Sequence, residues 1–171
     1  FAVAEPYGWH APTASFWQGV VPGRSVAAEL FGPDGERFAH RIGRALGELA
    51  ASRLTPALSA PASEHLVHIL RSIARAELAL PALAPRLERL SAVLGQRHAT
   101  LAPRATVPVH GAPNVHRWLV QGPRLGLVSF DRLALGDPEF DLTTLVAELE
   151  TEKVLARPIA AMEAALISGF E

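Results

Sequence analysis

Residues 107–150 decide how the chain folds, and they read VPVHGAPNVHRWLVQGPRLGLVSFDRLALGDPEFDLTTLVAELE. Short apolar runs alternate here with loops of Gly, Pro and Asn, a pattern typical of short strands joined by turns. Residues 118–120 and 125–130 predict a hairpin that turns at 121–123. Because polar residues gather in the loops between apolar runs, we expect the chemistry of the chain to lie in this stretch.

The end of this stretch predicts a helix. Asp137 is placed to cap it, and Pro138 suits the first helical position because that position has no N–H partner to lose. Five apolar residues at helical spacing then predict its buried face. They are Phe140, Leu142, Leu145, Val146 and Leu149.

Length and composition predict one globular unit, because 171 residues with 49% hydrophobic content suffice for a core. With 16 basic and 17 acidic side chains, bulk charge indicates neither a nucleic-acid groove nor an acidic substrate, and neither nucleic acid nor a membrane is expected as a partner. The chain lacks an apolar run long enough to span a bilayer and lacks a secretory signal, so we expect it to be soluble and cytoplasmic. Without cysteine, thiol catalysis and disulfides are excluded.

Residues 1–26 predict two short strands joined by a turn, because apolar runs are bounded there by Pro and Gly. Trp9, Phe16 and Trp17 are expected in the core or on a sheet face, with a wall of a ligand cleft as the alternative. Residues 37–52 predict an amphipathic helix, and residues 53–62 a loop. The buried face of that helix is expected to hold Phe38, Ile42, Ala45, Leu46 and Leu49.

Three further helices are predicted. Ser63 is expected to cap the first, from Glu64 onward, and the second covers residues 86–99. The last covers residues 158–168 and ends at Gly169. The buried stripes of the first two are expected to be Leu66, Ile69, Leu70 and Ile73, and then Leu87, Leu90, Val93 and Leu94.

Glu64, His65 and His68 share one face of a predicted helix, which raises the alternative of a metal site. A metallohydrolase helix requires His-Glu-x-x-His, whereas the order here is Glu-His-x-x-His without a third ligand nearby. A solvated helix face is therefore favoured, and no metal is expected.

The spaced pair His110-Gly111 and Gly136-Asp137-Pro138-x-x-Asp141-Leu142 resembles the aminoglycoside phosphotransferase and choline kinase-like family, which has the protein-kinase-like fold. In that family H-G-D-x-x-x-x-N is followed by a strand ending in I-D and then by G-D-P-x-x-D-L. The resemblance implies an α+β fold: a mostly helical C-lobe with short hairpins at the catalytic loop and with the N-lobe largely absent from this chain.

By the same resemblance, residues 1–26 are the last N-lobe strands and the hinge, and residues 27–171 are the C-lobe with a catalytic-loop frame at 107–142. Gln18, Gly19 and Val20 fall where the family holds the adenine edge of a nucleotide. The helices after residue 63 correspond to the variable substrate-side insertion.

The departures from the family pattern fall on the residues that carry chemistry. Family phosphoryl transfer uses an aspartate base, with an asparagine and a second aspartate as magnesium ligands. Ala112, Arg117 and Ser129 stand at those three positions, each adding a unit of positive charge to the site. Magnesium requires hard oxygen donors and is repelled by a guanidinium, so the sequence predicts no magnesium and no family catalysis. Asp131, two residues beyond Ser129, is expected to be a loop aspartate.

The retained residues have architectural roles in the family. The resemblance implies that His110 packs behind the catalytic loop, that Asp137 caps the following helix, and that Asp141 binds the amides of the loop. These roles preserve the shape of a loop without requiring turnover.

We therefore expect a catalytically degenerate phosphotransferase, a pseudokinase that binds or scaffolds. Its partner is expected to be a protein, such as an enzyme of the same pathway, with a small molecule or peptide as a second ligand. The alternative is an active or metal-independent phosphotransferase that uses ATP, in which Arg117 binds phosphate. A Ser129, His110 and Asp131 hydrolase triad is a weaker alternative, since no nucleophile-elbow glycines flank Ser129. Three replacements at once favour divergence over deliberate inactivation.

Overall fold

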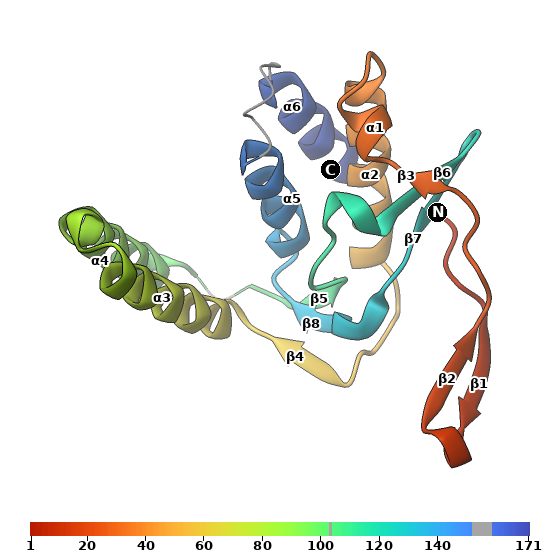
Figure 1. Ribbon diagram of the computed structural model, residues 1–171, viewed down its shortest axis with the longest axis horizontal. Helices are drawn as coiled ribbons and strands as arrows, with labels where there is room; N and C mark the ends of the chain where they lie inside the picture. Colours follow the sequence, from red (N-terminus) through yellow and green to blue (C-terminus); the bar gives the residue numbers. More distant parts are fainter. Residues whose placement is uncertain (103, 152–158) are drawn as a thin grey trace.

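The computed structural model describes residues 1–102, 104–151 and 159–171. It consists of a helical body with two small sheets, a β hairpin that projects from one side, and a two-helix arm that projects from the other (Figure 1). The body helices are α1 (Ala27–Leu30), α2 (Gly35–Ala50), α5 (Phe140–Thr151) and α6 (Ile159–Phe170). This mixture of helices and short strands confirms the predicted fold class.

Helix α2 is the centre of the core. All five apolar residues of its predicted stripe are buried, together with Leu145 and Leu149 of α5 and Leu166 of α6. Glycines bring α2 and α6 into backbone contact, since a Cβ on Gly43 would lie 2.0 Å from the carbonyl oxygen of Leu166. Gly169 makes the reciprocal contact with His40 from inside α6, so the prediction that it ends this helix is wrong. Pro158, the predicted start, lies outside the described residues.

Two three-stranded sheets support the residue 107–142 region. The first has the order β3 (Arg24–Ser25), β6 (Trp118–Gln121) and β7 (Arg124–Leu127), so the predicted hairpin and its turn are confirmed. The second has β8 (Ala134–Gly136) between β4 (Leu58–Ala60) and β5 (Val107–Val109). Strand β4 lies in the predicted loop 53–62. The sequence prediction missed it because its three residues lack alternation and gain order only by pairing with β8, in parallel.

The projecting hairpin consists of β1 (Pro6–His10), a 3-10 turn (Ala11–Thr13) and β2 (Ser15–Gln18), as the sequence predicts. Its aromatic residues are on the faces of the hairpin, but they are not core. Trp9, Phe16 and Trp17 are 63%, 56% and 61% exposed, because nothing among the described residues covers either face.

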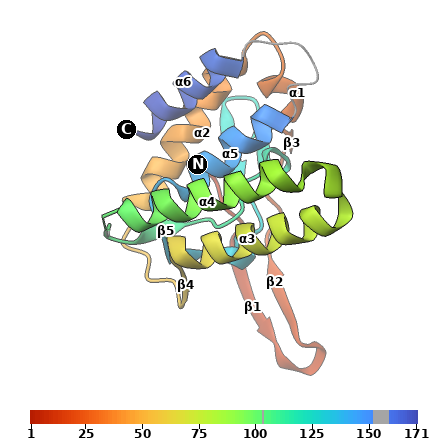
Figure 2. The ribbon, with the colours of Figure 1, turned by 90° about the vertical axis from the view of Figure 1, so that its left-hand side faces the viewer.

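The arm consists of α3 (Ala62–Ala79), a 3-10 turn (Pro81–Leu83) and α4 (Ala84–Thr100), which run side by side in opposite directions (Figure 2). Helix α3 begins at Ala62 after Pro61, so the predicted cap at Ser63 is wrong. Of the predicted buried stripes, Ile73 is buried, Leu66, Leu70, Leu87 and Leu94 are partly buried, and Ile69, Leu90 and Val93 are exposed. The prediction is wrong at the exposed positions because the two helices pack mainly on each other and leave their flanks in solvent. Leu90 and Val93 are about half exposed.

None of the helices within residues 1–102, 104–151 and 159–171 has both the length and the apolar character that crossing a bilayer requires.

Candidate functional site

Two loops meet at the centre of the body. Residues 110–117 connect β5 to β6 and end in a 3-10 turn (Val115–Arg117), and residues 128–133 connect β7 to β8 through a second one (Phe130–Arg132). The imidazole Nε2 of His110 joins the loops by donating to the carbonyl oxygen of Val128 at 3.0 Å. Gly111 has φ +82° and allows the closest approach, since a Cβ there would lie 2.3 Å from the carbonyl oxygen of Arg132.

Asp141 fixes the start of the first loop. Its two carboxylate oxygens accept the backbone N–H groups of His110, at 2.6 Å, and Gly111, at 2.9 Å. Only 3% of Asp141 is exposed, and burial raises its pKa to about 6, although both hydrogen bonds act in the opposite direction. The carboxylate at the first turn of α5 thus satisfies two amides that the sharp turn at Gly111 removes from the sheet.

His110 is fully buried, and both ring nitrogens are engaged. Since Nε2 donates to the carbonyl of Val128, Nδ1 is the acceptor, and the Ala112 N–H lies 3.4 Å from it. Burial lowers the pKa of His110, and the positive charge of Arg117 lowers it further. The ring is therefore neutral and holds the two loops together. It does not act as a base for Ser129, because both of its nitrogens are bonded to the backbone. The Ser129, His110 and Asp131 side chains therefore do not form a hydrolase triad.

Other residues that hold the loop were missed from the sequence. A carboxylate oxygen of Glu148, on α5, accepts the Val115 N–H at 2.8 Å, and the indole of Trp118 donates to the carbonyl of Pro113 at 3.1 Å. The side chain of Asn114 accepts the His116 N–H at 3.1 Å and caps the 3-10 turn. A signal for Glu148 was present, because it lies two turns after Asp141 on the inward face of an apolar helix.

Asp137 behaves as a capping residue, with Oδ1 accepting the Glu139 N–H at 3.0 Å just before α5. The predicted face of α5 is buried at Leu142, Leu145 and Leu149, while Phe140 and Val146 are partly buried.

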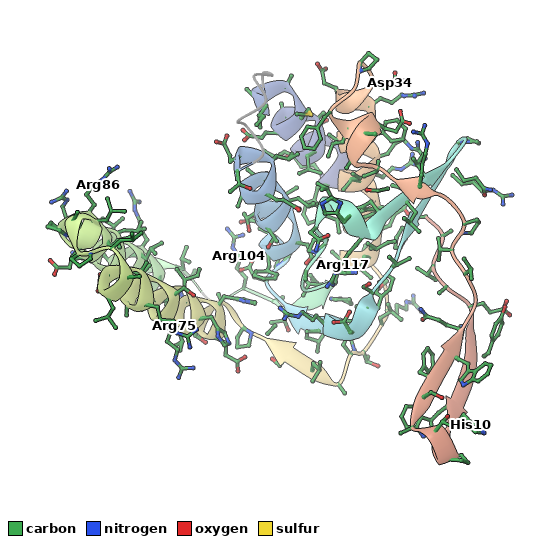
Figure 3. The ribbon with its side chains drawn as sticks, in the orientation of Figure 1. His10, Asp34, Arg75, Arg86, Arg104 and Arg117 are labelled. Carbon is green, nitrogen blue, oxygen red and sulfur yellow. The ribbon has the colours of Figure 1, made fainter. Side chains whose placement is uncertain are left out.

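The three departures from the family pattern lie on the rim of these loops. Ala112 presents a methyl group. Arg117 extends toward the second loop, where Nη1 donates to the carbonyl oxygen of Ser129 at 3.3 Å and lies 3.7 Å from the Asp131 carboxylate (Figure 3). The side chain of Arg117 is 24% exposed and that of Asp131 is 64% exposed. A guanidinium thus links the two loops.

Ser129 has a left-handed backbone conformation, with φ +68° and ψ +56°. This conformation is uncommon for residues with a Cβ, and Asp and Asn adopt it more readily than Ser because their side chains bond locally. The backbone of this position therefore suits an aspartate better than the serine that it carries.

The residues present do not fit a divalent cation. Ala112 and Ser129 supply no carboxylate, Arg117 is cationic, and Asp131 is paired with Arg117. In the part of the chain that the structure describes, no group of three or more His, Asp or Glu residues is arranged to hold a metal ion. His65 instead stacks on Phe140, with ring centroids 3.7 Å apart, and so connects the arm to the body.

Two further regions bear on the predicted site. At Gln18, Gly19 and Val20, the predicted hinge, the Gly19 N–H donates to the Glu5 carbonyl at 2.7 Å and Val20 is 91% exposed. A cleft of about 410 Å³ opens between the base of the arm and the start of α5, lined by Ser63, His98, Thr106, Asp137 and Glu139 among others. Ala112, Arg117 and Ser129 do not line it.

A family model described as "Phosphotransferase enzyme family" matches residues 1–171, the full chain. The chain belongs to the phosphotransferase enzyme family. No curated protein sequence matches it. The predicted resemblance to aminoglycoside phosphotransferases and choline kinase-like proteins is confirmed at the level of the family and the fold.

Solved structures of several kinases and phosphotransferases share the fold. A choline/ethanolamine kinase family protein from Mesorhizobium loti aligns with a TM-score of 0.72 at 18% identity, over 98% of this chain and 55% of that one. The Streptomyces rimosus aminoglycoside phosphotransferase APH(3'')-Id, solved with ADP and streptomycin, aligns with a TM-score of 0.66 at 20% identity, over 98% and 68%. A glucosamine kinase aligns with a TM-score of 0.70 at 19% identity, over 98% and 53%. The chain thus spans between about half and two thirds of these relatives.

The division at residue 26 and the roles of Gln18, Gly19, Val20 and Arg117 remain predictions.

Proposed function

We propose that this member of the phosphotransferase enzyme family is catalytically degenerate and works by binding. The observation that carries the proposal is the position of Arg117. Its guanidinium joins the Ser129 carbonyl and the Asp131 carboxylate between the two loops, where the family pattern calls for an asparagine and an aspartate that hold magnesium.

The missing base supports the same proposal. Ala112 has no group that accepts a proton, and the neighbouring imidazole of His110 is buried with both nitrogens bonded to backbone. A general base must reach the hydroxyl that it activates. A loop of the correct shape, without a base and without metal ligands, supports recognition more than transfer.

A binding role requires a ligand or a partner. Relatives with this fold were solved with ADP and streptomycin, and with glucosamine, ADP and phosphate. We propose that the cleft between the base of the arm and the start of α5 holds a small molecule or a peptide. We propose also that a protein, such as an enzyme of the same pathway, binds the chain, which then serves as a scaffold.

The test is ADP release from ATP in the presence of magnesium, with amino sugars and choline as acceptors. We expect no turnover above the buffer rate from the native chain and none from Ala112→Asp alone. Turnover by the native protein would contradict the proposal, whether or not Ala112→Asp raises it. The triple variant A112D/R117N/S129D restores the family pattern and shows whether this chain supports turnover once a base and metal ligands are present.

One observation favours a second function, metal-independent phosphate binding. The Arg117 side chain is partly exposed, and a guanidinium binds phosphate through two parallel hydrogen bonds. ATP would then bind without magnesium, either for transfer or as a ligand. Calorimetric titration of ATP in EDTA tests this function, because binding that is lost in Arg117→Gln supports it and absence of binding excludes it.

A further inference from the structure

The outer flank of α4 carries a line of exposed side chains with helical spacing. We define the α4 stripe as Arg86, Leu90, Val93 and Arg97 of α4, together with Leu83 in the turn just before the helix and Leu101 just after it. Steps of three or four residues place these side chains on one face of the helix. The apolar members are between 40% and 61% exposed, and α4 has no buried residue. An apolar stripe of this kind on an otherwise solvated helix marks an interaction surface.

The two arginines of the stripe are available to a partner. The side chains of Arg86 and Arg97 make no hydrogen bond or salt bridge within the described residues, whereas those of Arg104 and Arg117 pair with acidic side chains. Figure 3 shows Arg86 on the arm, far from Arg117. Arg97 lies eleven positions after Arg86 on the helix, which corresponds to about 16 Å along the axis.

From this stripe we infer that α4 docks an amphipathic helix of another protein, one that presents apolar side chains flanked by carboxylates at three- and four-residue spacing. Apolar contact would bury Leu90 and Val93 at the centre, and two carboxylates about three turns apart would pair with Arg86 and Arg97. A third helix against α3 and α4 also supplies the layer that a two-helix arm lacks.

The charges favour this occupant over a second copy of the chain. In a symmetric antiparallel dimer the stripe would face itself, which places Arg86 of one copy near Arg97 of the other and juxtaposes like charges. A separate helix with acidic flanks avoids this conflict, and an anionic membrane is an outcome of the test below.

The test uses the full chain and a fluorescein-labelled three-heptad peptide with Leu at the a and d positions and Glu at e and g. Its twin carries Lys in place of Glu. By fluorescence anisotropy we expect the Glu peptide to bind at least about tenfold more tightly than the Lys twin. The double variant R86E/R97E is expected to reverse that preference, and L90D/V93D to abolish binding. Leu78→Asp makes the same change at an exposed site outside the stripe and is expected to leave binding intact.

Equal binding of both peptides, a preference unchanged by R86E/R97E, or no binding of either peptide would overturn the inference. So would sedimentation of the native chain as a dimer that L90D/V93D dissociates, or binding to phosphatidylglycerol vesicles that L90D/V93D removes. The inference rests on the proposed binding role. The failures are distinguishable, because turnover would refute that role without changing the peptide preference, and peptide results do not depend on Ala112 or Arg117.

Discussion

The back of the two loops, formed by the buried His110 and Asp141, differs sharply from their rim, which carries Arg117 and Asp131. At the back, His110 and Asp141 are almost completely buried, and their polar atoms are bonded to the backbone. On the rim, Asp131 is largely exposed and Arg117 is held by one long hydrogen bond and one loose ion pair. The residues at the back determine the shape of the loops, and replacing these residues would unfold the loops. The rim determines chemistry, so it can change at little structural cost.

The largest expected effect is at the back. Asp141→Ala leaves the N–H groups of His110 and Gly111 buried without an acceptor, and we expect it to lower the free energy of unfolding by about 2–4 kcal/mol. Urea denaturation measures this loss. Asp131→Ala on the rim is the matched control, with an expected loss below about 1 kcal/mol. Similar losses of unfolding free energy in both variants would contradict the distinction between back and rim.

The pH dependence sharpens the comparison. The pKa of Asp141 rises from 3.8 to about 6 in the folded protein, so the folded state binds more protons than the unfolded state between these values. Its contribution to stability is therefore most favourable below about pH 4 and decreases as pH rises through 6, by at most about 3 kcal/mol.

Unfolding free energies of the native chain and Asp141→Asn between pH 4 and pH 7 test this sign, because the asparagine does not titrate. We expect the native chain to lose stability relative to the variant as pH rises, with no further change above pH 7. A gain over the same range would mean that the two amide hydrogen bonds outweigh burial.

A smaller effect is expected at Ser129, where the rim meets the backbone. Glycine relieves the left-handed conformation but gives the unfolded chain more freedom, so Ser129→Gly is expected to stabilise the protein by about 0.5–1 kcal/mol net. Ser59→Gly in β4 is the control, and there we expect a loss of about 0.5–1 kcal/mol. Thermal melts followed by circular dichroism compare the two. Destabilisation by Ser129→Gly would show that the serine makes a compensating contact.

The smallest effect is expected at Arg117. Its interactions are long and partly exposed, so Arg117→Gln is expected to change the free energy of unfolding by less than about 0.5 kcal/mol. Urea denaturation of this variant alongside Asp141→Ala compares the unfolding free energy lost at the rim with that lost at the back. A loss above about 2 kcal/mol would place Arg117 among the residues that hold the loops.

The features that were predicted from the sequence depend on local pattern or on a spaced motif. The stripe of α2, the hairpin at 118–127 and the cap at Asp137 are of this kind, as is the family. The errors have physical reasons. Leu90 and Val93 follow a buried-helix pattern, yet periodicity does not show whether a second surface exists to cover them. Strand β4 depends on pairing with a strand 76 positions later, since Leu58 lies opposite Ala134.

At the site, the positions of His110, Asp141 and Arg117 follow from the motif, whereas their partners do not. The contact of Arg117 with Ser129 and Asp131 depends on how two loops fold together, and the Glu148 bond to Val115 depends on the placement of α5. Trp9 and Trp17 illustrate the opposite case, because large aromatic residues favour burial but project here on an isolated hairpin.

The effect of magnesium on nucleotide binding tests the central claim most directly. ADP is titrated calorimetrically into the native chain and into A112D/R117N/S129D, with magnesium and with EDTA. The account predicts that magnesium leaves the native titration unchanged, because Arg117 lies between the loops and the described residues offer no set of carboxylates to hold the ion. It predicts tighter binding with magnesium only in the variant. Native binding that magnesium strengthens by more than about tenfold, or 1.4 kcal/mol, would contradict the account.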